Sequence, residues 1–182
     1  SSSSVYGVSE KPDVTEDHPL IPLTLYNKYK GVCELLLTKH TSDSFVGVIF
    51  RPATVCGYAP RQRLDVSVNI LTNHAVNKNK ITVFGGDQLS PNVHINDMVD
   101  SYLAVLNAPS KKINGEVFNV GFKNQSVNEL ANDVKEVIGK DIKIIKIIKI
   151  HFLKKHDYHN LLWKIFSLEI WFKELNSFLK KP

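Results

Sequence analysis

The order of predicted elements places this sequence in the α/β class. Apolar side chains recur at three- and four-residue spacing over residues 25–40, which is typical of a helix with one buried face. The β-branched run SFVGVIF, at residues 44–50, suits a strand buried on both faces of a parallel sheet. Residues 1–7 are expected to end an earlier strand at a turn on Gly7. Strand, long loop, helix and strand make a βαβ unit, which predicts a parallel sheet covered by helices.

The same alternation continues along the chain. Residues 8–24 and 51–63 are expected to be loops, the first because it carries three prolines and four acidic side chains. The further expected elements are a helix over 65–78, a strand over 81–86, a short strand over 93–95, a helix through 106, a strand over 116–122 and a helix ending at 138. Asn96 or Asp97 can cap the helix through residue 106. Ser126 and Glu129 have the spacing of a capping box.

The composition changes after Gly139. DIKIIKIIKIHFLKK repeats a K-I-I unit, and neither glycine nor proline follows until Pro182. KIIKIIKI can form an edge strand guarded by lysines or a basic amphipathic helix with a lysine at every third position. We interpret it as a solvated lysine face over a weak apolar stripe, and residues 141–182 as an atypical Lys/Ile-rich tail.

Composition limits the classes of partner. The 182 residues suffice for one domain, and the net charge of +5 owes much to lysines after Gly139. We find no basic patch with stacking aromatics and no apolar run near the ~18 residues of a membrane helix, so neither nucleic acid nor membrane is an expected partner. Cys33 and Cys56 match no metal spacing. We expect free, buried thiols in a reducing, cytoplasmic compartment, and no bound metal.

Tyr26 and Lys30 can carry chemistry because they lie four residues apart on one predicted helix face. An ammonium near a phenol favours the phenolate, which makes tyrosine usable as a general acid or base. A serine hydroxyl from a neighbouring strand end can hold the reacting groups in place. An exposed Tyr and Lys without function is the alternative. The order of motifs favours catalysis: a serine run ending in V-Y-G, a long loop, then Y-x-x-x-K with Glu34 four residues on.

These motifs resemble the extended short-chain dehydrogenase/reductase family, in its branch of NAD-dependent nucleotide-sugar epimerases and dehydratases. The resemblance spans roughly residues 1–140 and rests on SSSSVYG, YNKYK with Glu34, RPATVCGYAPRQR, ITVFGGDQ and NVHINDM. It implies the C-terminal half of a Rossmann-type doubly wound sheet plus a small α/β substrate-binding domain. Residues 1–57 would be the remnant of the NAD-binding domain with the catalytic residues, and residues 58–140 mainly the substrate-binding region.

The resemblance also implies catalytic roles. Tyr26 would be the acid/base, and Lys30 would bind the nicotinamide ribose of NAD and favour ionisation of Tyr26. Ser2 matches the catalytic Ser/Thr position. The dehydratases commonly carry Asp and Glu where this sequence has Ser3 and Ser4, which argues against loss of water. The implied function is epimerisation of a nucleotide sugar, as in UDP-glucose 4-epimerase, through a transient ketone.

Further positions would bind ligands by the same resemblance. Cofactor contacts are expected at Pro52 and Ala53, and substrate contacts at Ser2, Thr54, Arg61, Arg63, Thr82 and Phe84. Phe84 can equally be a core residue. The two arginines would replace an arginine of the family that is Ser90 here, and a solvated loop pair is the alternative. His94 and Asp97 would be structural, with His94 an inner hydrogen-bonded residue rather than a metal ligand.

A further departure from the family's pattern defines the alternatives. The family's G-x-x-G-x-x-G turn, which holds the NAD pyrophosphate, is absent from the sequence. We therefore expect the cofactor-holding half to lie outside this chain, supplied by a partner or by a longer protein that forms a homodimer through the helix over 25–40. A non-catalytic fragment or interaction module is the competing function. Dehydratase, decarboxylase or reductase chemistry is the alternative within the family.

Overall fold

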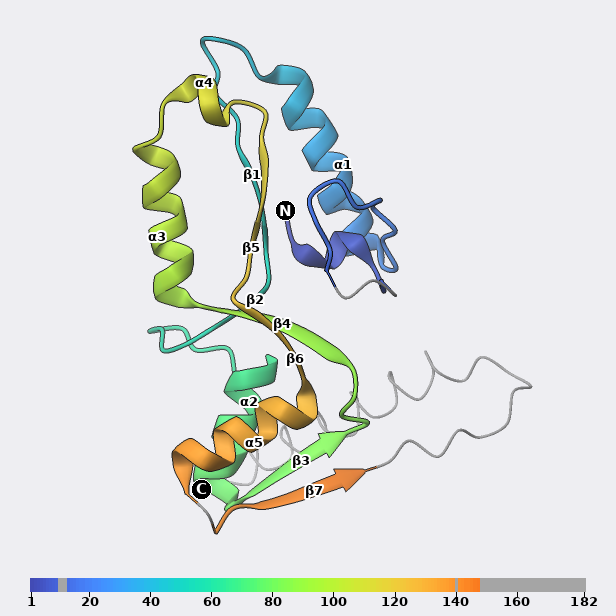
Figure 1. Ribbon diagram of the computed structural model, residues 1–182, viewed down its shortest axis with the longest axis vertical. Coiled ribbons are helices and arrows are strands. Elements are labelled where there is room, and N and C mark those ends of the chain that lie inside the picture. Colours follow the sequence, from blue (N-terminus) through green and yellow to red (C-terminus); the bar gives the residue numbers. More distant parts are fainter. Residues whose placement is uncertain (10–12, 140, 148–182) are drawn as a thin grey trace, which may run out of the picture. The chain divides into compact units, whose positions relative to one another are not determined.

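The computed structural model describes residues 1–9, 13–139 and 141–147, and Ser1–Ile147 form one compact unit (Figure 1). The fold is mixed α/β, as the sequence predicts. The K-I-I run after Ile147 and the rest of the expected tail lie outside the described residues.

A parallel pair of strands lies between two helices (Figure 1). Strands β1 (Ile49–Pro52) and β5 (Val117–Val120) pair in register, with Ile49 opposite Val117. Successive strand residues point to opposite faces. Phe50 accordingly contacts Tyr102 of α3 (Ile95–Leu106), and Arg51 contacts Glu34 of α1 (Leu25–His40). The two helices thus cover opposite faces of this pair.

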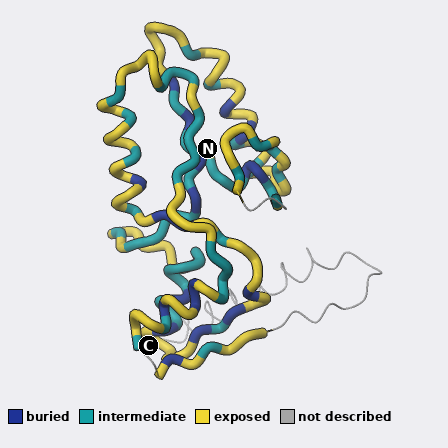
Figure 2. Tube along the Cα trace, viewed as in Figure 1, coloured by how far each residue is buried: buried dark blue, intermediate teal, exposed yellow. Residues whose placement is uncertain are grey.

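A second layer holds the largest core. Strands β3 (Lys80–Phe84) and β7 (Lys143–Ile147) pair in parallel, and helices α2 (Ser67–Lys78) and α5 (Val127–Ile138) pack beside them. The core residues are mostly small or branched and apolar: Leu71, Ala75, Ile81, Val83, Leu130, Ala131, Val134 and Ile142. The buried residues follow the inner faces of these elements (Figure 2). Of the two structures weighed for the start of the K-I-I run, a strand is observed, with Lys143 and Lys146 exposed.

Three further strands form a mixed sheet. Strand β4 (Leu89–His94) lies between β2 (Thr54–Cys56), which is parallel to it, and β6 (Lys123–Ser126), which is antiparallel. The loop expected over 51–63 is wrong in its first part, because β2 lies within it. Strand β6 was not predicted from the sequence. Thr54 and Lys123 both pair with Asn92. These strands are three to six residues long, and their pairing rather than their own pattern makes them strands.

The predictions for two helices, which rest on residues close together in the chain, are confirmed. Helix α1 has the predicted bounds, and Ser126 and Glu129 form the predicted capping box, with the Glu129 amide 3.2 Å from Ser126 Oγ and the Ser126 amide 2.7 Å from Glu129 Oε2. Helix α3 is capped by His94 instead of Asn96 or Asp97. A short helix α4 (Ser110–Ile113) precedes β5. None of the described helices is both long and apolar enough to cross a membrane.

Two strand predictions near the N-terminus are wrong. Residues Ser3–Tyr6 form the 3-10 helix η1, whose bonds run from the Val5 amide to the Ser2 carbonyl and from the Gly7 amide to the Ser4 carbonyl. The predicted turn at Gly7 is observed, with a φ of 73°. The strand expected over 44–50 begins only at Ile49, because Ser42 and Phe45 exchange backbone hydrogen bonds in a tight turn before it.

Candidate active site

A chain of hydrogen bonds joins the serine run to the first turn of α1. Ser2 Oγ lies 2.9 Å from Ser4 Oγ and also accepts from the Ser4 amide at 3.3 Å. Ser4 Oγ donates to Asn27 Oδ1 at 2.8 Å. Because a hydroxyl has one proton, Ser4 has none left for Ser2, so Ser2 donates to Ser4. Ser2 is thereby oriented from α1 at the residue next to Tyr26.

Tyr26 and Lys30 share a face of α1, as predicted. Thr24 caps the helix by accepting from the Asn27 amide at 3.2 Å, which fixes the turn that carries Tyr26. Lys30 Nζ lies 5.5 Å from the centre of the Tyr26 ring. Tyr26 is 61% exposed and Lys30 is half-buried, so the phenol is open to a ligand while the cation beside it is partly shielded.

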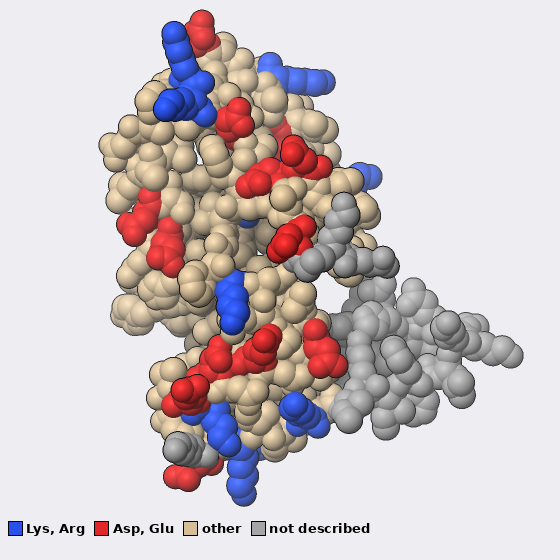
Figure 3. Space-filling view, in the orientation of Figure 1, with Lys and Arg blue, Asp and Glu red and all other residues tan. Residues whose placement is uncertain are grey.

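Arg63 lies in an exposed ion pair on the loop after β2. Its guanidinium donates to both carboxylate oxygens of Asp65, at 3.0 and 2.8 Å, and both side chains are 70% exposed. The hydrogen bond with Asp65 raises the pKa of Arg63. Arg61 is exposed on the same loop. Basic and acidic side chains are interspersed over the face in Figure 3.

The predicted cofactor positions differ in accessibility. Ala53 is 7% exposed, and its amide donates to the Val120 carbonyl at 2.8 Å. A Cβ built on Gly121 would stand 3.4 Å from the Ala53 Cβ, so this side chain packs against the neighbouring strand. The Ala53 side chain is therefore mostly enclosed by its neighbours in the fold. Pro52 and Thr54 are half-buried on either side of it.

The two predicted base-binding residues lie on β3, in the layer of α2 and α5, whereas Ser2 and Tyr26 belong to the layer of α1. Thr82 is half-buried and Phe84 is 59% exposed. The core alternative for Phe84 is therefore not what the structure shows. Gly85 follows Phe84 with a φ of 71°, so the backbone turns sharply where the strand ends.

His94 is hydrogen-bonded but exposed, so its expected inner position is wrong. Its Nδ1 accepts from the Asn96 amide at 3.2 Å and caps α3. Gly57 has a φ of 118°, and a Cβ there would stand 2.8 Å from His94 Nε2, so only glycine permits this approach. Within the described ranges, no three His, Cys, Asp or Glu side chains are grouped as a metal site. Cys33 and Cys56 are free as expected, but Cys33 is exposed.

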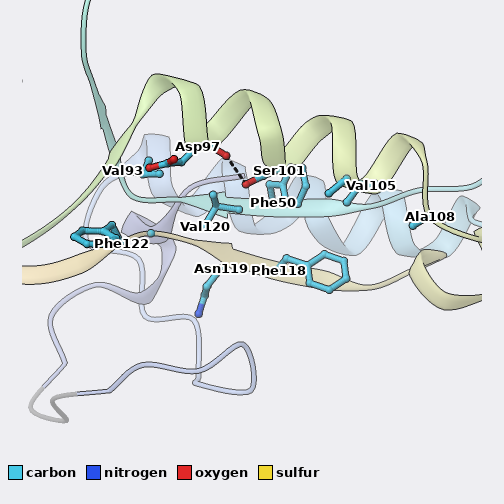
Figure 4. A pocket seen from close by; sticks show the side chains of 12 residues that line it. Phe50, Val93, Asp97, Ser101, Val105, Ala108, Phe118, Asn119, Val120 and Phe122 are labelled. Atoms are coloured by element: carbon cyan, nitrogen blue, oxygen red, sulfur yellow. Dashed lines mark hydrogen bonds between the residues drawn. The ribbon is translucent and has the colours of Figure 1, made fainter.

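A cavity of about 520 Å³ opens between α3 and the β1–β5 pair (Figure 4). Its lining is mainly apolar, with Phe50 and Phe118 6.2 Å apart between ring centres. Ser101 Oγ donates to the Asp97 carbonyl at its rim. Because Phe50 and Arg51 point to opposite faces of β1, this cavity lies on the face away from α1 and its tyrosine.

A buried polar cluster lies on the face of the β1–β5 pair that α1 covers, and it was not predicted from the sequence. Arg51 Nε and Nη2 donate to the two carboxylate oxygens of Glu34 at 3.0 and 2.6 Å. Burial raises the pKa of Glu34, but hydrogen bonds led by Arg51 outweigh it, so the net pKa is lowered. Glu34 and Arg51 both belong to the motifs quoted from the sequence. The available signal was an Arg directly after a strand predicted to be buried and a Glu on a helix with one buried face.

The parallel strand–helix units and the Ser–Tyr–Lys arrangement define an α/β protein of the Rossmann type. The sequence profile of the NAD dependent epimerase/dehydratase family matches residues 1–121, and the chain belongs to this family. The family depends on NAD, as its description states, and the relatives described next are named for nucleotide-sugar substrates.

Three relatives show the extent of the likeness. UDP-glucose 4-epimerase of Lactobacillus helveticus is 28% identical over 161 residues, covering 78% of this chain and 48% of that protein. The structure of UDP-glucuronic acid 4-epimerase from Bacillus cereus, in complex with UDP-glucuronic acid and NAD, is 29% identical with a TM-score of 0.66, covering 81% and 46%. That of the NDP-hexosamine 5,6-dehydratase TunA is 28% identical with a TM-score of 0.65, covering 80% and 47%. The chain spans about half the length of these relatives.

Proposed function

We propose that this chain carries the catalytic and substrate-binding part of an NAD-dependent nucleotide-sugar epimerase of the UDP-glucose 4-epimerase type. One observation carries the proposal. Ser2 is linked through Ser4 to Asn27, the neighbour of Tyr26, and Lys30 lies over the Tyr26 ring. A hydroxyl tied to the first turn of α1 and a phenol beside a cation support acid–base chemistry at a sugar hydroxyl.

Each residue has a distinct part in the proposed reaction. Tyr26 removes the proton of a sugar hydroxyl, and the charge on Lys30 stabilises the phenolate that does so. Ser2, on turning its proton away from Ser4, donates to the oxygen of the same hydroxyl and orients it. The sugar becomes a ketone, turns in the site and is reduced on its other face, while Tyr26 returns the proton. NAD, when bound, supplies the reversible uptake of hydride from the sugar carbon.

The residues present suit only one end of NAD. The exposed Tyr26 with the ammonium of Lys30 offers donors for the nicotinamide ribose. The sequence has no G-x-x-G-x-x-G to cradle the pyrophosphate. We propose that residues corresponding to the half of the relatives that this chain does not span complete the cofactor site. The division into 1–57 for the cofactor and catalysis and 58–140 for substrate belongs to the same proposal.

Substrate binding is proposed on the loop after β2 and on β3. Arg61 is the better candidate for the diphosphate, because Arg63 already donates to both oxygens of Asp65. Thr54 would bond the sugar or a phosphate oxygen. Thr82 and the exposed Phe84 would contact the nucleotide base, Phe84 by stacking.

Epimerisation is favoured over loss of water because Ser3 and Ser4 offer no carboxylate beside Ser2, and Ser4 is engaged by Asn27. A second candidate is an interaction module without turnover. It is favoured by the exposed apolar residues Leu25, Val32 and Leu36 along α1, which also suit a homodimer. A cytoplasmic location is part of the proposal, consistent with the free thiols of Cys33 and Cys56.

Substitution of one hydroxyl tests the assignment. Tyr26→Phe keeps the ring but removes the acid/base. In a protein in which the half of the relatives that this chain does not span completes the cofactor site, NAD-dependent interconversion of UDP-glucose and UDP-galactose should therefore fall by about 10²–10⁴-fold. Tyr29→Phe is the matched control, because Tyr29 is 64% exposed one turn further along α1. It should leave the rate unchanged. Equal rates for the unaltered chain and Tyr26→Phe would refute the role, and absence of turnover in every form would favour the interaction module.

A further inference from the structure

Arg51 is the centre of a buried polar cluster that the proposed reaction does not use directly. Two ion pairs lie in the described part of the chain, Arg51–Glu34 and Arg63–Asp65, and only the first is buried, with both side chains at most 7% exposed. Its two parallel hydrogen bonds are 3.0 and 2.6 Å long. The pair therefore joins β1 to α1 in a fixed geometry.

The third nitrogen of the guanidinium holds two other segments. Arg51 Nη1 donates to Tyr6 Oη at 2.7 Å and to the Glu16 carbonyl at 2.8 Å. The Arg51 Cζ atom also lies 4.9 Å from the centre of the Tyr6 ring. One side chain thus binds α1, η1 and the loop after η1 at once. A lysine ammonium could not reproduce this fork.

Tyr6 connects the cluster to a second strand, β5, by a hydrogen bond. Its hydroxyl, having accepted from Arg51, donates to Asn119 Oδ1 at 2.6 Å. The Asn119 amide donates to the Glu16 carboxylate at 2.7 Å, and its side chain donates to the Val14 carbonyl at 3.0 Å. Every group of this cluster therefore has its partners, as a buried polar network needs if it is to specify one arrangement.

The cluster and the proposed catalytic residues occupy the same two elements. Glu34 lies four residues after Lys30 and eight after Tyr26, which places the three on one side of α1. Tyr6 is the last residue of η1, and Ser2, four residues earlier, directly precedes η1. The Arg51 cluster therefore ties one end of η1 to α1, and the Ser4–Asn27 bond ties the other.

We propose that Arg51, held by Glu34, is a positioning residue that fixes η1 against α1 and so sets Ser2 relative to Tyr26 and Lys30. The inference rests on the proposed function for the roles of those three residues. A buried ion pair adds little net stability, because the loss of hydration offsets the attraction, but its directional bonds can select one arrangement. Here the arrangement selected is the one between the serine and the tyrosine.

Hydrogen exchange on the full 182-residue chain tests the positioning without any need for turnover. Arg51→Met with Glu34→Leu removes both charges and keeps apolar volume. The Val5 and Gly7 amides, which bond to the Ser2 and Ser4 carbonyls, should exchange at least about tenfold faster. Amides of α1 and α5 should keep their protection, and the melting temperature should change by no more than about 3 °C.

A matched control exists within the chain. Arg63→Met with Asp65→Leu removes the same kind of bidentate pair from an exposed site and should not alter exchange at Val5 or Gly7. The exchanged pair Glu34→Arg with Arg51→Glu keeps two opposite charges but loses the donors to Tyr6 and Glu16, so it should not restore protection. Tyr6→Phe removes one hydroxyl from a buried ring and should raise exchange in η1 by itself.

The outcomes separate positioning from general stability. Unchanged η1 exchange in Tyr6→Phe, or full protection in the charge-exchanged pair, would overturn the proposal. Exchange that rises equally in η1, α1 and α5 of the Met/Leu variant would also overturn it, since the pair would then support the whole fold. Where turnover is measurable, Tyr6→Phe should lower kcat about tenfold with KM unchanged, and an effect on KM alone contradicts positioning. Missing turnover counts against the proposed function and leaves the exchange result standing.

Discussion

Lys30 Nζ lies 5.5 Å from the centre of the Tyr26 ring, across one turn of α1. The helix fixes this distance, because residues four apart lie one above the other on its surface. Tyr26 is 61% exposed, and the next residue in the chain, Asn27, is hydrogen-bonded through Ser4 to Ser2. The relationship is therefore local in origin and open to a ligand.

Loss of the Lys30 charge should weaken the base more than the fold. Lys30→Met keeps most of the apolar stem but removes the cation that lies 5.5 Å from the centre of the Tyr26 ring. NAD-dependent epimerisation should therefore fall by about ten- to a hundredfold where the cofactor site is complete, as a steady-state rate measures. Lys28→Met, an exposed lysine of the same helix, is the control and should retain the original rate. A rate for Lys30→Met that matches the unaltered protein would contradict the role of the charge.

Stability should fall in acid through Glu34. The pKa of Glu34 in the fold is lowered from its ordinary value of 4.5, because hydrogen bonds led by Arg51 outweigh the effect of burial. The stabilisation is therefore complete above about pH 4.5 and is lost as pH falls below it through the lowered pKa. Thermal unfolding between pH 3 and pH 7, roughly, should show a smaller acid dependence in Glu34→Gln than in the unaltered chain. Glu136→Gln, exposed on α5, should keep the original dependence.

The capping box should contribute measurably to α5. Ser126→Ala removes the acceptor for the Glu129 amide and a partner of the Glu129 carboxylate, at 3.2 and 2.9 Å. The free energy of unfolding should decrease by about 0.5–2 kcal/mol in denaturant titrations. Ser110→Ala in the first turn of α4, where no side-chain cap bond forms, should change it by less than about 0.5 kcal/mol. Equal effects of the two substitutions would show that the cap is not the cause.

NAD should bind this chain weakly. The sequence lacks the glycine-rich turn that holds the pyrophosphate, and Tyr26 and Lys30 address only the ribose end. Calorimetric titration of NAD into the 182-residue chain should therefore show no heat of binding, which corresponds to a Kd above about 1 mM. A micromolar Kd that Lys30→Met abolishes would contradict the view that the cofactor site is incomplete.

Features that depend on residues close together in the chain could be predicted from the sequence. The bounds of α1, the shared face of Tyr26 and Lys30 and the Ser126–Glu129 box all arise from contacts within a few residues. Their spacing is therefore visible in the sequence. The α/β class was predictable for the same reason, since it follows from the order of such elements.

Contacts between segments that lie far apart in the chain could not be predicted from the sequence and are seen only in the folded protein. The Glu34–Arg51 pair joins residues 17 apart, and Tyr6 reaches Asn119 across 113 residues. The serine run forms η1 instead of a strand end, with Ser4 bonded to Asn27 in α1. Such pairings depend on the path of the whole chain, because a buried charge or hydroxyl takes its partner from whichever segment folding brings beside it.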